Sequence, residues 1–415
     1  MKKIIFLLLI VPTLLFGQEW ERTYAKGIGQ SVQQTNDGGY IITGSDGIDK
    51  VVLIKTDSYG DTLWTRNYGD NDYQSGQSVV QTTDGGYIVL GYIQSIGPYS
   101  DFYLIRTDSN GDTLWTKAFG GSGPEYGMCI QQTTDGGFII TGSSAPNNGY
   151  YVITLQKLDE NGNIIWNRNF SGPRHNFGKT VQQTTDGGFF ITGGTTLENN
   201  NIYPILIKTD ENGYKIWGKI YETLAYTSSG IQTNDGGFIV TGSTFSIGFG
   251  QNVFLLKTDE NGDSLWMKTF GGIDYDGGNF VQQLLDEGYI ITGYKNQSGS
   301  QNSSLYLIKT DSNGDTLWTR TYGENGTGES IRQTIDGGYI ITGKTNVGGE
   351  DYIYLVKTDI NGTLVSIPEI PILNPNRKLI KTVDLSGKQI TEPQKNRPYI
   401  EIYNDGTTQK KVIIK

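Results

Sequence analysis

The sequence is poor in the residues on which much enzyme chemistry depends. It contains one cysteine, Cys129, and one histidine, His175, in 415 residues. A single cysteine excludes an intrachain disulfide, and any histidine-based metal site or catalytic triad has to be built around His175. His175 lies in the loop-like segment FSGPRHNFG and predicts a solvated side chain, whereas Cys129 lies in the strand-like segment GMCIQQT and predicts a buried one. We therefore expect no catalytic residues, no metal and no cofactor.

Basic residues and long apolar runs are also scarce. Lys and Arg number 33 against 43 Asp and Glu, and the formal net charge of −10 repels phosphate backbones, so nucleic acid is not expected as a partner. The longest apolar run, Ile4 to Phe16, is shorter than the roughly 20 residues that span a bilayer. Because Lys2 and Lys3 precede it and Gly17 follows it, residues 1–17 predict a secretory signal peptide, with no membrane span after its removal.

Glycine and tyrosine are abundant, and one motif recurs along the chain. The 58 glycines and 26 tyrosines suit many short strands and tight turns. Residues 35–44 read TNDGGYIITG, and residues 334–343 read TIDGGYIITG. Alignment on the aspartate of this motif gives seven copies 47 to 51 residues apart: Asp37, Asp84, Asp135, Asp186, Asp235, Asp286 and Asp336. A period near 50 indicates stacked or radial repeats that bury their faces against one another.

Each repeat reads as four strands, and the third repeat shows them as GMCIQQT, GGFIITG, YVITLQKLD and IIWNRNF. Asp-Gly and Asn-Gly turns predict hairpins between the first and second and between the third and fourth strands. A calcium loop does not fit the second turn, because the twelfth position counted from Asp108 is Phe119 instead of Glu. The second strand is almost wholly apolar and belongs in the middle of a sheet.

The first strand is polar and predicts the lining of a wet central channel. A glutamine stands three residues before the motif aspartate in every repeat: Gln34, Gln81, Gln132, Gln183, Gln232, Gln283 and Gln333. The fourth strand carries the pattern Trp-x-Lys/Arg-x-Tyr/Phe, whose three side chains share one face of a strand and predict packing. Its tryptophans are Trp20, Trp64, Trp115, Trp166, Trp217, Trp266 and Trp318.

The seventh repeat lacks its tryptophan strand. In the first six repeats Trp stands seven residues after the aspartate of the second hairpin turn, but the corresponding position after Asp359 is Ser366. An unassigned tryptophan strand, Trp20 to Tyr24, precedes the first repeat. A ring in which this strand completes the seventh repeat leaves no open sheet edge, whereas a linear solenoid, the alternative, needs polar caps. We predict an all-β fold with a seven-bladed β-propeller over residues 18–366, closed by the N-terminal strand.

The hairpin turn and tryptophan together, as in KTDSNGDTLW at 309–318, resemble the repeats of quinoprotein-type propellers. The resemblance covers residues 18–366 and implies the fold more than an activity. A quinone-dependent dehydrogenase is not expected, because that family commonly has eight blades and an adjacent cysteine pair.

The last part of the chain differs from the repeats. Residues 367–373, with Pro368 and Pro371, predict a stiff linker. In residues 374–415 the segments VDLSGK, PYIEIY and KKVIIK resemble the type A C-terminal sorting domain of the type IX secretion system, although Arg397 replaces a customary glycine. The resemblance implies a small β-sandwich-like domain, recognition by the type IX secretion machinery, and a location outside or on the surface of a Gram-negative bacterium. A generic capping hairpin is the alternative.

The loops that follow the second and fourth strands open on one face of such a ring and vary between repeats, so they are the candidate binding surface. Their aromatic and acidic residues suit sugar rings and hydroxyl groups. The candidates are Asp72, Tyr73, Glu125, Tyr126, Phe177, Tyr226, Asp274, Tyr275 and Asp276. We expect a non-enzymatic protein that binds a surface protein or a glycan. A glycoside hydrolase-like enzyme that uses two of these carboxylates, a structural role in the surface layer, and ordinary solvated loops remain alternatives.

Overall fold

The computed structural model describes residues 20–69, 73–94, 99–146, 149–246, 250–296, 302–364, 379–384, 388–390, 398–403 and 408–412. The chain divides into two compact units, residues 1–365 and residues 366–415. The predicted signal peptide at 1–17 and the predicted linker at 367–373 lie outside the described residues. In the described part of the chain, no helix has the length and hydropathy of a membrane span.

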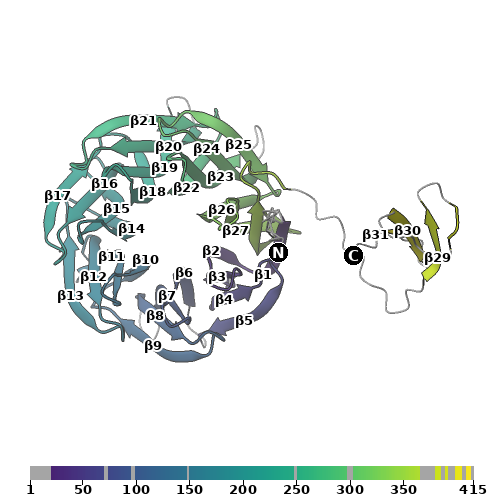
Figure 1. Ribbon diagram of the computed structural model, residues 1–415. Helices are drawn as coiled ribbons and strands as arrows, with labels where there is room; N and C mark the ends of the chain where they lie inside the picture. Colours follow the sequence, from purple (N-terminus) through teal and green to yellow (C-terminus); the bar gives the residue numbers. More distant parts are fainter. Residues whose placement is uncertain are drawn as a thin grey trace, which may run out of the picture. The chain divides into compact units, whose positions relative to one another are not determined.

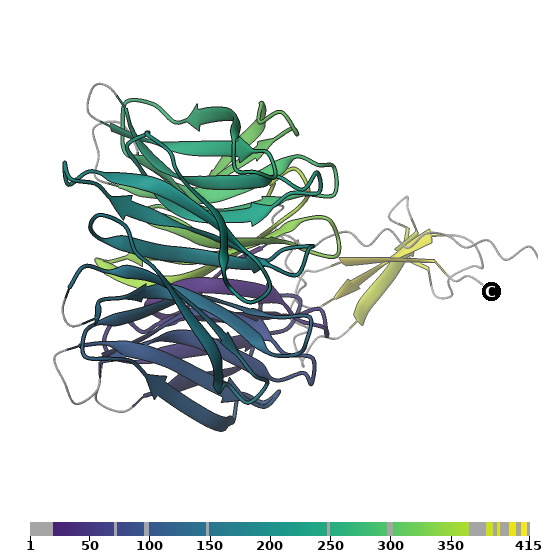
Figure 2. The same ribbon diagram turned by 90° about the vertical axis from the view of Figure 1, so that its left-hand side faces the viewer.

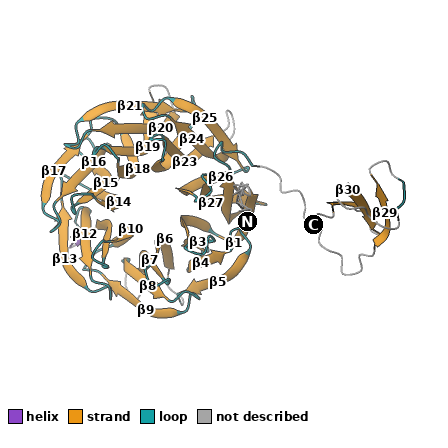
Figure 3. Cartoon of the chain, in the orientation of Figure 1, coloured by secondary structure: helices purple, strands orange, loops and turns teal. Residues whose placement is uncertain are grey.

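The described residues of the first unit form seven four-stranded antiparallel sheets arranged as the blades of a ring (Figure 1; Figure 3). In blades 1 to 6 the strands follow chain order from the centre outward. Blade 1 has β2 (Ile28–Gln34), β3 (Tyr40–Ser45), β4 (Val51–Thr56) and β5 (Thr62–Tyr68); blade 2 has β6 (Tyr73–Gln81), β7 (Tyr87–Gln94), β8 (Asp101–Thr107) and β9 (Thr113–Phe119). Blade 3 has β10 (Glu125–Gln132), β11 (Phe138–Ser144), β12 (Val152–Leu158) and β13 (Ile164–Phe170).

The remaining blades repeat this order. Blade 4 has β14 (Asn176–Gln183), β15 (Phe189–Thr196), β16 (Ile202–Thr209) and β17 (Lys215–Ile220); blade 5 has β18 (Ala225–Gln232), β19 (Phe238–Ser246), β20 (Gly250–Thr258) and β21 (Ser264–Phe270). Blade 6 has β22 (Asp276–Gln283), β23 (Tyr289–Asn296), β24 (Ser303–Thr310) and β25 (Thr316–Tyr322). Blade 7 has β26 (Gly326–Gln333), β27 (Tyr339–Val347), β28 (Glu350–Thr358) and, outermost, β1 (Trp20–Lys26). The predicted seven-bladed β-propeller is confirmed.

Strand β1 closes the ring as predicted. It pairs antiparallel with β28, and Trp20 stands opposite Lys357. The other outer strands use the same register, with Trp64 opposite Lys55 in blade 1 and Trp318 opposite Lys309 in blade 6. The first described strand therefore lies beside the last blade (Figure 1). A linear solenoid is excluded, because the first and last repeats are hydrogen-bonded through one sheet.

Each outer-strand tryptophan packs on a glycine turn of the next blade. A Cβ atom added to Gly60 would lie 2.5 Å from the Trp20 ring, and Gly60 also has a φ of 79°, which favours glycine. The hydroxyl of Tyr24 donates a hydrogen bond to the same glycine's carbonyl oxygen at 2.7 Å. The contact recurs between Trp64 and Gly111, Trp115 and Gly162, Trp166 and Gly213, Trp217 and Gly262, Trp266 and Gly314, and Trp318 and Gly362. The tryptophans thus join neighbouring blades.

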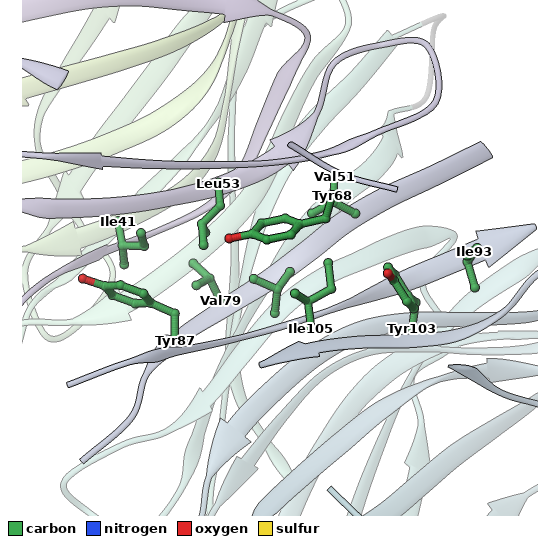
Figure 4. Close-up of a cluster of buried hydrophobic side chains, with 10 residues drawn as sticks. Ile41, Val51, Leu53, Tyr68, Val79, Tyr87, Ile93, Tyr103 and Ile105 are labelled. Carbon is green, nitrogen blue, oxygen red and sulfur yellow. The ribbon is translucent and has the colours of Figure 1, made fainter. Parts of the chain in front are cut away.

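The hydrophobic core lies between adjacent sheets. Figure 4 shows one cluster, in which Ile41 and Leu53 of blade 1 face Tyr87 and Ile105 of blade 2. All four side chains are at most 1 % exposed. The second and third strands are covered on both faces, which accounts for their nearly continuous apolar sequence.

A buried cation in every blade is held by the motif aspartate. Lys55 is 3 % exposed, and its Nζ lies 2.9 Å from the Asp37 carboxylate and donates to the Thr56 carbonyl oxygen at 2.8 Å. The partners in the other blades are Asp84 and Arg106, Asp135 and Lys157, Asp186 and Lys208, Asp235 and Lys257, Asp286 and Lys309, and Asp336 and Lys357. The aspartate of the Asp-Gly-Gly motif is therefore a counter-ion as well as a turn residue.

The repeated glutamines form hydrogen bonds between neighbouring blades. Gln81 accepts a hydrogen bond from the Asn36 backbone N–H at 2.9 Å, and its own amide donates to the Gly85 carbonyl oxygen. Gln34 makes the same contact across the closure of the ring, with the N–H of Ile335 at 3.0 Å. Several of these glutamines also line the central channel, as the sequence predicted. Their hydrogen bonds between blades were not predicted.

The second unit contains an antiparallel sheet in the order β29 (Leu379–Asp384), β30 (Pro398–Tyr403) and β31 (Thr408–Val412). Val383 and Tyr399 are buried. The described residues of this unit form this three-stranded sheet, and the small β-sandwich-like sorting domain predicted for residues 374–415 stays a prediction.

Replacement of Trp20 by alanine tests the closure. We expect Trp20→Ala to lower the free energy of unfolding by about 3–5 kcal/mol, because it leaves a cavity where blade 7 meets the Gly60 turn. Thr23→Ala, at an exposed position of the same strand, should stay within about 0.5 kcal/mol of the unchanged protein. Urea unfolding measures both values. Equal stability of the two variants would contradict the closure.

Candidate functional site

The loops of the ring gather on two opposite faces, because the strands run between those faces (Figure 2). One face carries the Asp-Gly-Gly and Asn-Gly turns, which repeat the same backbone hydrogen bonds from blade to blade, such as Thr35 N–H to Gly39 and Thr184 N–H to Gly188. The other face, here called the variable-loop face, carries the loops after the second and fourth strands, including 120–124, 171–175 and 271–275. Differences between repeats are concentrated there.

A chain of aromatic contacts crosses blades 2, 3 and 4 on the variable-loop face. We call it the aromatic belt; its members are Tyr73, Tyr92, Tyr126, Tyr150, Tyr151, His175 and Phe177. The ring centroids of Tyr92 and Tyr126 are 5.1 Å apart, and those of Tyr151 and Phe177 are 5.4 Å apart. The longest step, from Tyr73 to Tyr92, is 6.2 Å. These are contact distances for aromatic rings, so the belt is continuous.

Strands of three blades position the belt. Tyr73 begins β6, Tyr92 lies in β7, Tyr126 lies in β10 and Phe177 lies in β14. Tyr73 is 50 % exposed, whereas Tyr92 and Tyr126 are half-buried. Burial, together with the neighbouring Tyr73 hydroxyl, raises the pKa of Tyr92 to about 12, so its hydroxyl remains a neutral donor at neutral pH. The belt therefore offers partly exposed ring surface with polar edges.

The structure brings together only some of the predicted site residues. Tyr73, Tyr126 and Phe177 belong to the belt, but Tyr226 contacts Phe245 in blade 5, with ring centroids 5.5 Å apart. Tyr275 is 53 % exposed in the loop before blade 6, beside the half-buried Asp274. Asp72 lies outside the described residues.

His175, expected to be a solvated loop residue, lies in the loop before β14 and is half-buried. Its ring stacks on Phe177, with an interplanar angle of 10°, and contacts Tyr150. Its Nδ1 accepts a hydrogen bond from the Tyr151 N–H at 3.3 Å. Tyr92 and Tyr151 were not among the predicted site residues. Both are aromatic residues at or beside a strand end next to the variable loops, and this feature of the sequence could have identified them.

Glu125 lies beneath its loop instead of on the rim. It is 5 % exposed, and its Oε1 accepts a hydrogen bond from the Gly121 N–H at 2.8 Å. A Cβ atom on Gly120 would lie 2.1 Å from Asp101 Oδ1 and 2.4 Å from Glu125 Oε2, so the two carboxyl groups converge under this turn. Burial, and then the charge and hydrogen bond of Asp101, raise the pKa of Glu125 to about 7. Protonation of Glu125 therefore removes its repulsion from the Asp101 carboxylate.

The residues that correspond to Glu125 support the same loop in other blades. Asp276 in blade 6 is 1 % exposed, accepts a hydrogen bond from the Gly272 N–H at 3.2 Å, and has Asn252 in the place of Asp101. Asn176 in blade 4 is also 1 % exposed and donates to the Arg174 carbonyl oxygen at 2.7 Å. Glu125 and Asp276 therefore cap turns in separate blades and do not form a pair. Within the described residues, no group of three or more His, Cys, Asp or Glu side chains is placed to hold a metal ion.

No protein family and no curated protein matches the sequence. Solved structures share the fold. An ulvan lyase from a new family of polysaccharide lyases has 9 % identity and a TM-score of 0.56, with 82 % of this chain and 96 % of that chain covered. The Neurospora crassa Pan2 WD40 domain has 12 % identity and a TM-score of 0.52, over 84 % and 98 % of the two chains. A Bacteroides caccae protein of unknown function has 12 % identity and a TM-score of 0.45, over 72 % and 94 %. At these identities the two structures with TM-scores above 0.5 establish the propeller fold alone.

The Asp101 and Glu125 pair predicts a pH-dependent stability. Because the folded pKa of Glu125 is raised from 4.5 to about 7, the stability that its proton provides is complete below 4.5 and is lost as the pH rises through 7. The melting temperature should therefore fall between pH 4.5 and 8, relative to that of Glu125→Gln, which carries no titratable group there. Asp101→Asn, which copies Asn252, should also reduce the fall. Identical pH profiles for all three proteins would contradict the raised pKa of Glu125.

Proposed function

We propose that the protein binds a glycan chain along the aromatic belt. The observation that carries the proposal is the unbroken series of ring contacts from Tyr73 to Phe177 across three blades. Partly exposed aromatic faces stack on the apolar faces of sugar rings, and the tyrosine hydroxyls bond to sugar hydroxyls. Variable loops on a rigid scaffold are a common location for such sites.

The shape of the belt favours a chain ligand over a globular protein partner. From Tyr73 to Tyr151 the rings follow one another in series, whereas a stable protein interface buries roughly 800 Å² on each partner over a broad patch. A surface protein remains the second kind of ligand that variable loops suit.

The placement of the carboxyl groups supports binding without hydrolysis. A glycoside hydrolase needs two carboxyl groups about 5–9.5 Å apart on either side of the scissile bond. Glu125 and Asp276 lie under loops of different blades, and Asp101 is turned toward Glu125 beneath Gly120. These groups stabilise turns, so the hydrolase alternative has less support than the binding function.

We further propose that the protein acts outside the cell or on its surface. The support is sequence-based: the apolar run at 4–16 after two lysines, and the resemblance of residues 374–415 to a type IX sorting domain. A glycan-binding site suits this location, because polysaccharides are abundant on and around bacterial surfaces.

A comparison of two tyrosine variants tests the glycan proposal. Tyr126→Ala removes a ring from the middle of the belt, and we expect it to weaken binding to the polysaccharide that a glycan array identifies by about tenfold or more, or about 1.4 kcal/mol. Tyr226→Ala removes an exposed ring outside the belt, on the same face, and should leave the affinity unchanged.

Equal losses in both variants, or an array without any bound glycan, would contradict the proposal. A hydrolysis assay on the bound polysaccharide separates the alternative: turnover that disappears in Glu125→Gln would establish an enzyme instead of a binding protein.

A further inference from the structure

Every innermost strand contains a β-bulge at the same place. The register shifts after Gly29, Gly76, Gly127, Gly178, Thr227, Gly278 and Gly328. The extra residues are Gln30, Gln77, Met128, Lys179, Ser228, Asn279 and Glu329, here called the bulge ring. A bulge re-aims a side chain and is often found beside a functional site.

All members of the bulge ring line one central channel with a volume of about 910 Å³. The flanking positions are nearly constant, with glycine before the bulge residue in six blades and a small polar residue after it in most of them. The bulge residue itself changes between amide, thioether, ammonium, hydroxyl and carboxylate. The packing of the blades does not require this variety, because the side chains point into the channel.

The two charged members of the ring are held differently. Glu329 accepts hydrogen bonds from Asn279 Nδ2 at 3.0 Å and from Thr327 Oγ1 at 2.7 Å. Among the described residues, no hydrogen bond or ion pair satisfies Lys179 Nζ. Burial lowers the pKa of Lys179, and the charge of Glu329 opposes this shift. Lys179 is half-buried in the channel wall, so its ammonium group is available to an anionic ligand in the channel.

A second cation adds to the positive charge of the channel. Arg332, three residues beyond Glu329 on β26, lies over the Phe280 ring at 4.3 Å and donates to the Ile331 carbonyl oxygen. Lys179 and Arg332 together outweigh Glu329, although the whole protein carries a net charge of −10. The channel therefore attracts small anions that the outer surface repels.

We propose that the bulge ring binds a small hydroxylated carboxylate, with its carboxylate on Lys179 and its hydroxyl groups on Gln30, Gln77 and Glu329. The amides supply donors and acceptors, and Glu329 accepts from a hydroxyl. The site is distinct from the aromatic belt, although β14 contributes Phe177 to the belt and Lys179 to the ring. The proposal does not depend on glycan binding.

Calorimetric titration with D-gluconate and sorbitol tests the proposal, since the two molecules have the same carbon chain and differ in the carboxylate. We expect gluconate to bind at one site per chain, and sorbitol to bind at least tenfold more weakly. Lys179→Gln should weaken gluconate binding at least tenfold. This variant copies Gln30 and Gln77 at the same position, so it should fold, and its melting temperature verifies this.

Two further variants make the test specific. Glu329→Gln keeps a side-chain oxygen that can accept from the hydroxyl group but removes the negative charge, so it should tighten gluconate binding severalfold. A purely structural role of Glu329 predicts weaker binding. Tyr126→Ala should leave gluconate binding unchanged, which separates this site from the belt. No gluconate binding, equal binding of sorbitol, or an undiminished affinity in Lys179→Gln would overturn the proposal.

Discussion

The contact between a tryptophan of one blade and a glycine turn of the next is the constraint on which the ring depends. It needs a flat side chain on the outer strand and a turn without a Cβ atom, as Trp64 and Gly111 illustrate. Because each tryptophan reaches forward to the following blade, no blade is complete by itself. The last contact around the ring, from blade 7 to blade 1, is made by Trp20, the first residue of β1.

These contacts between blades leave only a few positions free for function. The motif aspartate pairs with a buried cation, the glutamines bond to turns of neighbouring blades, and the middle strands form the core. The variable loops and the bulge ring are the places where the repeats differ without disturbing those contacts. Both candidate sites lie at these places, the aromatic belt on the outside and the bulge ring in the channel.

The sequence was sufficient for the fold because its strongest signals are local and repeated. Asp-Gly turns, apolar second strands and one unassigned tryptophan strand fixed the number of blades and the closure. The belt was only partly predictable: Tyr92 of β7 and Tyr151, just before β12, both contact Tyr126, and such contacts join residues tens of positions apart. Glu125 and Asp276 have the sequence context of exposed loop acids, but the glycine turns above them fold back and bury them. The burial of Lys55 could not be inferred from the sequence, because lysine is rarely buried without a partner and the ion pair with Asp37 was not predicted.

The hydrogen bond between Glu21 and Tyr354 joins residues 333 positions apart. During synthesis, β1 leaves the ribosome before any other strand of the propeller, yet its partner β28 is made after all the others. The newly made chain therefore carries an unpaired strand edge until it is nearly finished, and such an edge is prone to pairing with other chains. A translation product that stops before β28 cannot close the ring. The pairing of β1 with β28 therefore distinguishes chains with all seven blades from shorter ones.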